Sequence, residues 1–235
     1  MNFWQKTARV SAWLLFALAA LVILYRSYGL LIGGMNRLLG ALSVALSVLA
    51  PALAGAALYA ASLEREADKR RMLRAVLWTL FGFYLLALFS ARFFARIDFR
   101  GYAAQHDFYR ENMELMTNFI PFETILLYIR ALRYDYIGTT IPLANLMGNI
   151  CLFMPMAFFL PCLFPSMRRF WKFLVLMLLL LMAVECLQLI LCCGSCDVDD
   201  VLLNLTGTLI VYGLMRLPPV RRLLTRLYLL PAADQ

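Results

Sequence analysis

Residues 170–191 read FWKFLVLMLLLLMAVECLQLIL, an apolar run whose only strongly polar side chains are Lys172, Glu185 and Gln188. A helix of about 20 apolar residues is long enough to cross a lipid bilayer. Soluble proteins are about 45–50% apolar and about 25% charged, whereas this chain of 235 residues is 63% hydrophobic and 15% charged, with a mean hydropathy of +0.77. The sequence therefore predicts an all-α, polytopic integral membrane protein. It excludes soluble enzymes, secreted disulfide scaffolds and disordered tails.

Further apolar segments on both sides of this run predict a helical bundle of about six transmembrane helices. The predicted spans are residues 8–25, 38–61, 75–91, 139–164, 170–191 and 198–217. The long connector between the third and fourth spans contains an apolar stretch, residues 118–129, that is too short to cross and predicts an interfacial or re-entrant segment. Pro121 suits the first turn of a helix in this stretch.

The chain divides by character into four parts. We expect a three-helix membrane segment without evident chemistry, an outer connector, a three-helix polar core and a basic tail, at residues 1–95, 96–138, 139–217 and 218–235. Lys and Arg are more frequent in the connectors that would share a side with the termini, and the positive-inside rule then places both termini in the cytoplasm. This asymmetry, with its attraction to anionic lipids, explains the net charge of +8 without a nucleic-acid partner.

Polar side chains recur at helical spacing in the last three predicted spans. Because offsets of three and four keep residues on one helical face, each span would present a polar pair or triplet, and the predicted topology places these at similar depth in the outer leaflet. An ionisable residue at such depth is costly and usually faces a cavity or a partner. We therefore expect one binding pocket lined by Asn145, Asn149, Glu185, Gln188, Asp197, Asp199, Asp200 and Asn204.

Simpler interpretations of these residues remain open. Buried Asn and Gln can serve only as hydrogen bonds between helices, and Asp at the beginning of a helix can serve only as a cap. Four neighbouring carboxylates would repel one another unless a raised pKa, a divalent cation or an arginine neutralises them. The arginines of the outer connector that we consider for this role are Arg110, Arg130 and Arg133.

The cysteines and the single histidine offer weaker signals. Cys193 and Cys196 have CxxC spacing at the outer end of the fifth predicted span. This spacing leaves a disulfide, a thiol redox pair, a thiolate metal site and free thiols as alternatives. His106 lies in the polar connector, where a solvated surface role is the simplest interpretation, and no histidine-based triad can be formed in the pocket.

Four short motifs in order give the chain a family resemblance. They are NFIPF at 118–122, NLMGN at 145–149 with Phe153 and Pro155 following, ECLQ at 185–188 and DVDDVLLNLTG at 197–207. Over roughly residues 110–217 this pattern resembles the VanZ-like family of membrane proteins, whose founding member is linked to teicoplanin resistance. The chain lacks the basic residue that usually precedes the Asp motif, where it has Gly194, Ser195 and Cys196, and it has Ala157 and Val211 where glycine is common.

The resemblance implies a multi-pass protein of the bacterial plasma membrane that lowers susceptibility to lipid-tailed glycopeptides. In this interpretation the pocket binds or reorganises a lipid-anchored ligand, such as a lipid-linked wall precursor or the lipoglycopeptide itself. One alternative is a membrane-embedded hydrolase or transferase, with Glu185 or Asp200 as general base and Asp197 and Asp199 as ligands of a divalent cation. Another is a small transporter with Glu185 as its titrating group.

Overall fold

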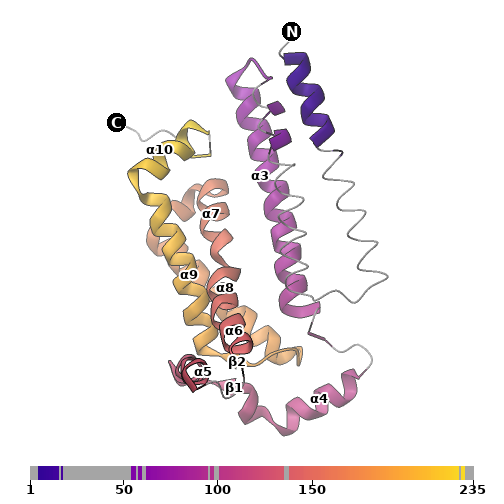
Figure 1. The fold of residues 1–235 in the computed structure, drawn as a ribbon, viewed down its shortest axis with the longest axis vertical. Helices are drawn as coiled ribbons and strands as arrows, with labels where there is room; N and C mark the ends of the chain where they lie inside the picture. The colour runs from indigo at the N-terminus through magenta and orange to yellow at the C-terminus, as the bar shows by residue number, and fades with distance from the viewer. Residues whose placement is uncertain are drawn as a thin grey trace. The chain divides into compact units, whose positions relative to one another are not determined.

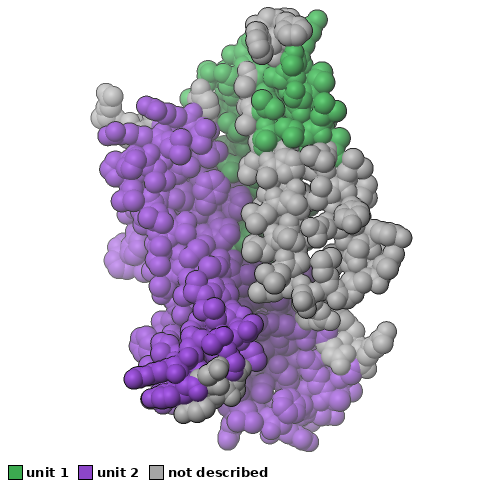
Figure 2. All heavy atoms as spheres, in the orientation of Figure 1, with its two compact units in different colours: residues 1–87 green, residues 88–235 purple. Residues whose placement is uncertain are grey.

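The structure, a computed structural model, describes a large part of the chain. The described residues are 5–15, 17, 54–56, 58–59, 62–94, 96–97, 101–134, 138–227 and 229–230. The predicted spans at 8–25 and 38–61 lie largely outside them. The chain forms two compact units, residues 1–87 and 88–235, which are coloured separately in Figure 2 and are described here one at a time.

Unit 1 contains most of the long helix α3, Glu66–Phe89. Glu66 and Asp68 lie in its first turn, where carboxylates complement the positive end of the helix dipole. The helix begins before the predicted span at 75–91, because charged residues that are unfavourable in hydrocarbon are compatible with a helix end. Its end passes into unit 2 and continues as a π-helix, η1, Ser90–Phe94.

Unit 2 is helical and holds three of the four helices that are long and apolar enough to cross a membrane among the described residues. Its elements are α4 (Tyr102–Glu111), η2 (Met113–Met116), β1 (Thr117–Asn118), α5 (Glu123–Tyr134), α6 (Thr140–Leu152), α7 (Met154–Leu163), η3 (Pro165–Arg168), α8 (Phe170–Ile190), β2 (Cys196–Asp197), α9 (Val198–Arg216) and α10 (Pro218–Arg226). Within this unit, α9 packs against α6, α7 and α8 (Figure 1). The helical fold class and the last three apolar segments are thus confirmed.

The predicted span at 139–164 is a broken helix. Helices α6 and α7 meet at Phe153, and Pro155 follows in the first turn of α7. Proline has no backbone N–H, and its ring clashes with the carbonyl four residues earlier, so a helix cannot pass regularly through this position. The combined segment Thr140–Leu163 still has the length and hydropathy of one span.

A short parallel pairing modifies the expectation of a purely helical protein. Strand β1 pairs with β2, with Thr117 opposite Cys196 and Asn118 opposite Asp197. This pairing brings the connector against the beginning of α9. The connector helix α5 begins at Glu123, two residues beyond Pro121, so Pro121 lies before the helix and not in its first turn.

Helices α6 and α9 approach closely at a glycine. A Cβ atom added to Gly207 would lie 1.8 Å from the carbonyl oxygen of Ile150, well inside van der Waals contact. Small residues allow helix backbones to approach in this way in membranes. This contact sets the spacing at which polar side chains of α6 and α9 meet.

Candidate functional site

An arginine in the middle of η1 lies at the centre of the polar residues of unit 2. Arg92 is 3% exposed. Its Nη2 donates to Glu185 Oε1 at 2.8 Å and lies 3.9 Å from Asp200 Oδ2, and its Nη1 donates to Asn149 Oδ1 at 3.2 Å. Single-turn π-helices often occur at functional positions, and this one delivers Arg92 to carboxylates from α8 and α9.

Amides join the rest of the group. The Asn149 amide donates to Asp200 Oδ1, while Asn204 Nδ2 donates to the Asp200 carbonyl at 2.7 Å and to Asn149 Oδ1 at 3.4 Å. The Gln188 amide donates to the Arg92 carbonyl at 3.0 Å. We call Arg92, Asn149, Glu185, Gln188, Asp200 and Asn204 the polar cluster.

The sequence did not identify Arg92 as the counter-charge. It directly follows the third predicted span and falls within residues 1–95, the segment in which the sequence shows no evident chemistry. Arg110, Arg130 and Arg133, which we considered for this role, are exposed and form no salt bridge with any residue that the structure describes. The one available signal was an arginine in the last turn of an apolar helix, where a charge needs a partner.

The polar cluster has unused hydrogen-bonding capacity. The Arg92 guanidinium faces the carboxyl groups of Glu185 and Asp200. Two buried atoms, Arg92 Nε and Asn204 Oδ1, make no hydrogen bond within the described part of the chain. Most buried polar atoms in proteins are satisfied, so such atoms indicate capacity for an additional polar partner.

Asp197 and Asp199 belong to a different arrangement. Asp197 caps α9 by accepting from the Asp199 N–H at 2.8 Å, and its carboxylate also accepts from Asn118 Nδ2 at 3.0 Å and Thr124 Oγ1 at 2.7 Å. Asp199, fully buried, accepts from the backbone N–H groups of Phe122 at 2.6 Å and Ile125 at 3.0 Å. Both carboxylates therefore attach the connector to α9.

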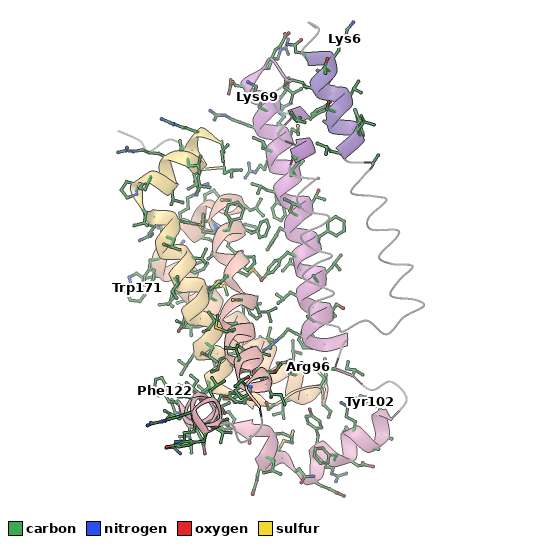
Figure 3. The ribbon with its side chains drawn as sticks, in the orientation of Figure 1. Lys6, Lys69, Arg96, Tyr102, Phe122 and Trp171 are labelled. Carbon is green, nitrogen blue, oxygen red and sulfur yellow. The ribbon has the colours of Figure 1, made fainter. Side chains whose placement is uncertain are left out.

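The Asp199 carboxylate caps α5 from another helix. Phe122, labelled beside α5 in Figure 3, has a φ of +70°, an uncommon conformation for a residue with a side chain. The first N–H groups of a helix have no partner within it, and Asp199 supplies one while its charge complements the helix dipole.

Replacing this cap should loosen α5. We expect Asp199→Asn to lose one of two charge-assisted hydrogen bonds, which are worth about 1.5–3 kcal/mol each, and to speed amide hydrogen exchange at residues 122–129. The matched control is Asp107→Asn, which alters an exposed carboxylate of α4. Equal exchange rates in the Asp199→Asn and wild-type proteins would contradict the role of this cap.

Asn145 lies apart from the polar cluster. Its amide donates to the Ile141 carbonyl of its own helix at 3.0 Å, and it makes no hydrogen bond to the polar cluster in the described structure. The expected pocket of eight residues thus divides into the polar cluster, the cap formed by Asp197 and Asp199, and the separate Asn145.

The site offers little to a metal ion. Among the described residues no group of three or more His, Cys, Asp or Glu side chains is arranged to hold one. Asp197 and Asp199, the predicted cation ligands, use both of their oxygens to accept hydrogen bonds. These two carboxylates therefore do not fit a divalent cation in this arrangement.

Glu185 and Asp200, the two candidate general bases, differ in how accessible their carboxyl groups are from outside the protein. Glu185 Oε1 accepts from Arg92, and its Oε2 accepts from the Asp197 N–H at 3.5 Å. The Asp200 side chain is 20% exposed, against 4% for Glu185. Burial, and then the carboxylates of Asp200 and Asp197, raise the pKa of the Tyr128 hydroxyl in α5. Asp200 is the group of the polar cluster that an outside molecule can reach.

The cysteines are free thiols in the structure, including Cys193 and Cys196. Burial raises the pKa of both thiols, which disfavours the thiolate needed for redox chemistry or metal binding. His106 is exposed and lies 3.9 Å from the Asp107 carboxylate, away from the polar cluster in the chain and in keeping with a surface role.

A family model described as VanZ/LLP1 matches residues 81–219. No curated protein and no solved structure shows a significant match. The matched region covers more than half of the chain and begins well before residue 118, where the first of the four motifs starts. It therefore includes Arg92 together with every other member of the polar cluster. The chain belongs to the VanZ-like family.

Proposed function

We propose that this VanZ-like membrane protein lowers susceptibility to teicoplanin-type lipoglycopeptides by binding a lipid-anchored ligand at the outer leaflet of the bacterial plasma membrane. The ligand is either a lipid-linked wall precursor or the lipid-tailed antibiotic. Asp200 receives its polar part, and the surface of α5 receives its apolar part.

The proposed orientation has six spans and cytoplasmic termini. In unit 2 the basic residues of η3, α10 and the adjoining helix ends lie at one end of α8 and α9, whereas Glu185 and Asp200 lie near the other end. Basic residues concentrate on the cytoplasmic side of membrane proteins. The polar cluster would then face the outer leaflet, and residues 96–138 would form the outer connector.

The accessibility of Asp200 carries the proposal. A carboxylate accepts hydrogen bonds from the amine, amide and hydroxyl donors that peptides and sugars present. The Asp200 side chain is partly exposed, and its carboxylate is held in place by the hydrogen bond from the Asn149 amide. The unpartnered Arg92 Nε and Asn204 Oδ1 give the same cluster capacity to rearrange around a bound polar group or a water molecule.

Exposed apolar side chains on the connector support the assignment of a lipid-tailed ligand. Leu126, Leu127 and Ile129 of α5 are about half exposed, and Phe119 and Ile120 are more so. Such a face suits the boundary between headgroups and acyl chains. Because Asp197 and Asp199 bind the beginning of α5 to α9, this face is held close to Asp200.

A membrane-embedded hydrolase or transferase is the second candidate, and the access of Asp200 beside Tyr128 favours it. In that case Asp200 would act as general base on a lipid-linked substrate. The test is whether the purified protein releases a product from a lipid-linked precursor. Such an activity, if it is lost in Asp200→Asn, would favour the enzyme over the binding protein.

The functional test compares carboxylate variants in a sensitive bacterial host. Asp200→Asn keeps the shape of the side chain but removes the charge that strengthens a hydrogen bond, so we expect ligand binding to weaken about tenfold. The readout is the minimal inhibitory concentration of teicoplanin, with a glycopeptide that lacks an acyl tail as comparison. Wild-type protein should raise the value for teicoplanin only, and Asp200→Asn should return it towards that of the host without the protein.

Glu123→Gln is the matched control, because it removes an exposed carboxylate at the beginning of α5. It should protect like the wild type. Full protection by Asp200→Asn at equal membrane abundance would refute a role for the polar cluster in binding. Equal protection against the tail-less glycopeptide would refute the assignment of a lipid-anchored ligand.

A further inference from the structure

A cavity of about 360 Å³ lies at the end of unit 2 opposite the polar cluster. Its wall contains Arg168 of η3, Tyr212 and Arg216 of α9, and Arg221 of α10. Its volume is within the range of sites that bind small molecules. Pro161, Met215 and Leu230 supply apolar wall around the guanidinium groups.

Backbone carbonyls and an aromatic ring position two of these arginines. Arg168 Nε donates to the Pro161 carbonyl at 3.0 Å, and Arg216 Nη2 donates to the Arg168 carbonyl at 3.0 Å. The Arg216 guanidinium lies 4.9 Å from the centre of the Tyr212 ring, which is itself stacked on the buried Phe173. The side chains are thus held in place before any ligand binds, and each retains N–H groups for other acceptors.

Within residues 138–227, the carboxylates lie far from this cavity along the helices. From residue 138 to 227 the sequence has only four acidic residues, Glu185, Asp197, Asp199 and Asp200. Glu185 lies 15 residues beyond the first residue of α8, or about 22 Å along the helix. The same stretch has seven basic residues, which are Arg168, Arg169, Lys172, Arg216, Arg221, Arg222 and Arg226. No described carboxylate pairs with the three arginines of the cavity.

Three guanidinium groups around one space repel one another unless an anion lies among them. Their planar N–H groups match phosphate oxygens in geometry as well as in charge. We propose that this cavity binds the phosphate-bearing headgroup of an anionic phospholipid. It is a site distinct from the polar cluster and does not depend on the function proposed for that cluster.

The surroundings favour a phospholipid over free phosphate. Leu217, Leu223 and Leu227, in and beside α10, expose about half of their surface next to the arginines of the same helix, as in helices that lie at a membrane interface. Trp171, 72% exposed, projects from the beginning of α8 (Figure 3), and tryptophan is typical of the headgroup level. Basic pockets between membrane helices are known to receive anionic headgroups.

The test measures lipid binding to the purified full chain in a neutral detergent by native mass spectrometry. Dioctanoyl phosphatidylglycerol should bind at least about tenfold more tightly than dioctanoyl phosphatidylcholine, whose phosphate charge is offset by its own choline. Arg221→Gln should weaken phosphatidylglycerol binding about tenfold, the effect of one charge-assisted contact. Arg221→Lys keeps the charge but loses the planar guanidinium that can donate two parallel hydrogen bonds, so its affinity for phosphatidylglycerol should lie between those of the wild type and Arg221→Gln.

Arg222→Gln is the matched control, because its side chain is exposed on the same helix and does not line the cavity. It should change phosphatidylglycerol binding less than about twofold. If Arg221→Gln and Arg222→Gln weakened phosphatidylglycerol binding equally, the lipid would be held by general attraction to the basic surface, and the specific site would be refuted. Binding of inorganic phosphate as tight as that of phosphatidylglycerol would overturn the lipid assignment.

Discussion

Gly207→Ala is expected to destabilise the protein by about 3 kcal/mol, the upper end of the usual range for overpacked cores. The added Cβ would lie 1.8 Å from the Ile150 carbonyl oxygen. Because that atom belongs to the backbone of α6, no side-chain rotation can relieve the clash, and α6 and α9 must separate. Separation would break the hydrogen bond that Asn204 donates to Asn149 and the one that Asn149 donates to Asp200.

The measurement is the thermal unfolding midpoint of the protein in detergent. Gly213→Ala is the matched control, since it lies in the same helix and its added Cβ would meet no atom within 4 Å. This control should be neutral or stabilising by up to about 1 kcal/mol, because alanine is the better helix former. Equal midpoints for the two variants would show that α6 and α9 do not pack closely at Gly207.

Arg92→Met should give the second large effect. Removing one partner of a buried ion pair leaves the other charge uncompensated and costs about 3–5 kcal/mol. Here the uncompensated groups are Glu185, which is 4% exposed, and the partly exposed Asp200. We expect a marked fall in the unfolding midpoint and a loss of protection against teicoplanin.

Two further variants distinguish the effect of breaking the Arg92–Glu185 ion pair from the effect of removing any arginine. Arg110→Met alters an exposed arginine of α4 that forms no salt bridge with any described residue and should change the midpoint little. The double variant Arg92→Met, Glu185→Met should be more stable than Arg92→Met alone, because a buried pair replaced by apolar side chains is often tolerated. A double variant as unstable as the sum of the two single variants would contradict the direct pairing of Arg92 with Glu185.

The spans of unit 2 could be predicted because their signals are local. The predicted segments 170–191 and 198–217 differ by one residue each from helices α8 and α9. Apolar length, the Pro218 that follows α9 and the Asp197 cap that precedes it are all visible in the sequence. The break at Phe153 was missed because a proline in a long apolar run is compatible with one kinked span.

The polar cluster was only partly predictable. Helical spacing shows which residues share one face of a helix, but it does not show at what height along that helix a neighbouring helix contacts the face. Asn145 and Asn149 share a face of α6, yet they differ by one turn, about 6 Å. The helix α9 presents Asp200 and Asn204 at the level of Asn149. Likewise, Asp199 caps α5 only because β1 and β2 pair in one register, and pairing so short has no clear sequence signal.

The separation of charge along α8 and α9 also gives this pair of helices a permanent electric dipole. The carboxylates carried by α8 and α9 lie near one end of these helices, and Arg168, Arg216 and Arg221 lie near the other. A transmembrane voltage does work on such a dipole, up to about 2.3 kcal/mol for each elementary charge that crosses the full thickness at 100 mV. In the proposed orientation, the inside-negative potential of an energised cell pulls the basic end inwards, so a de-energised membrane holds this domain less firmly in its orientation.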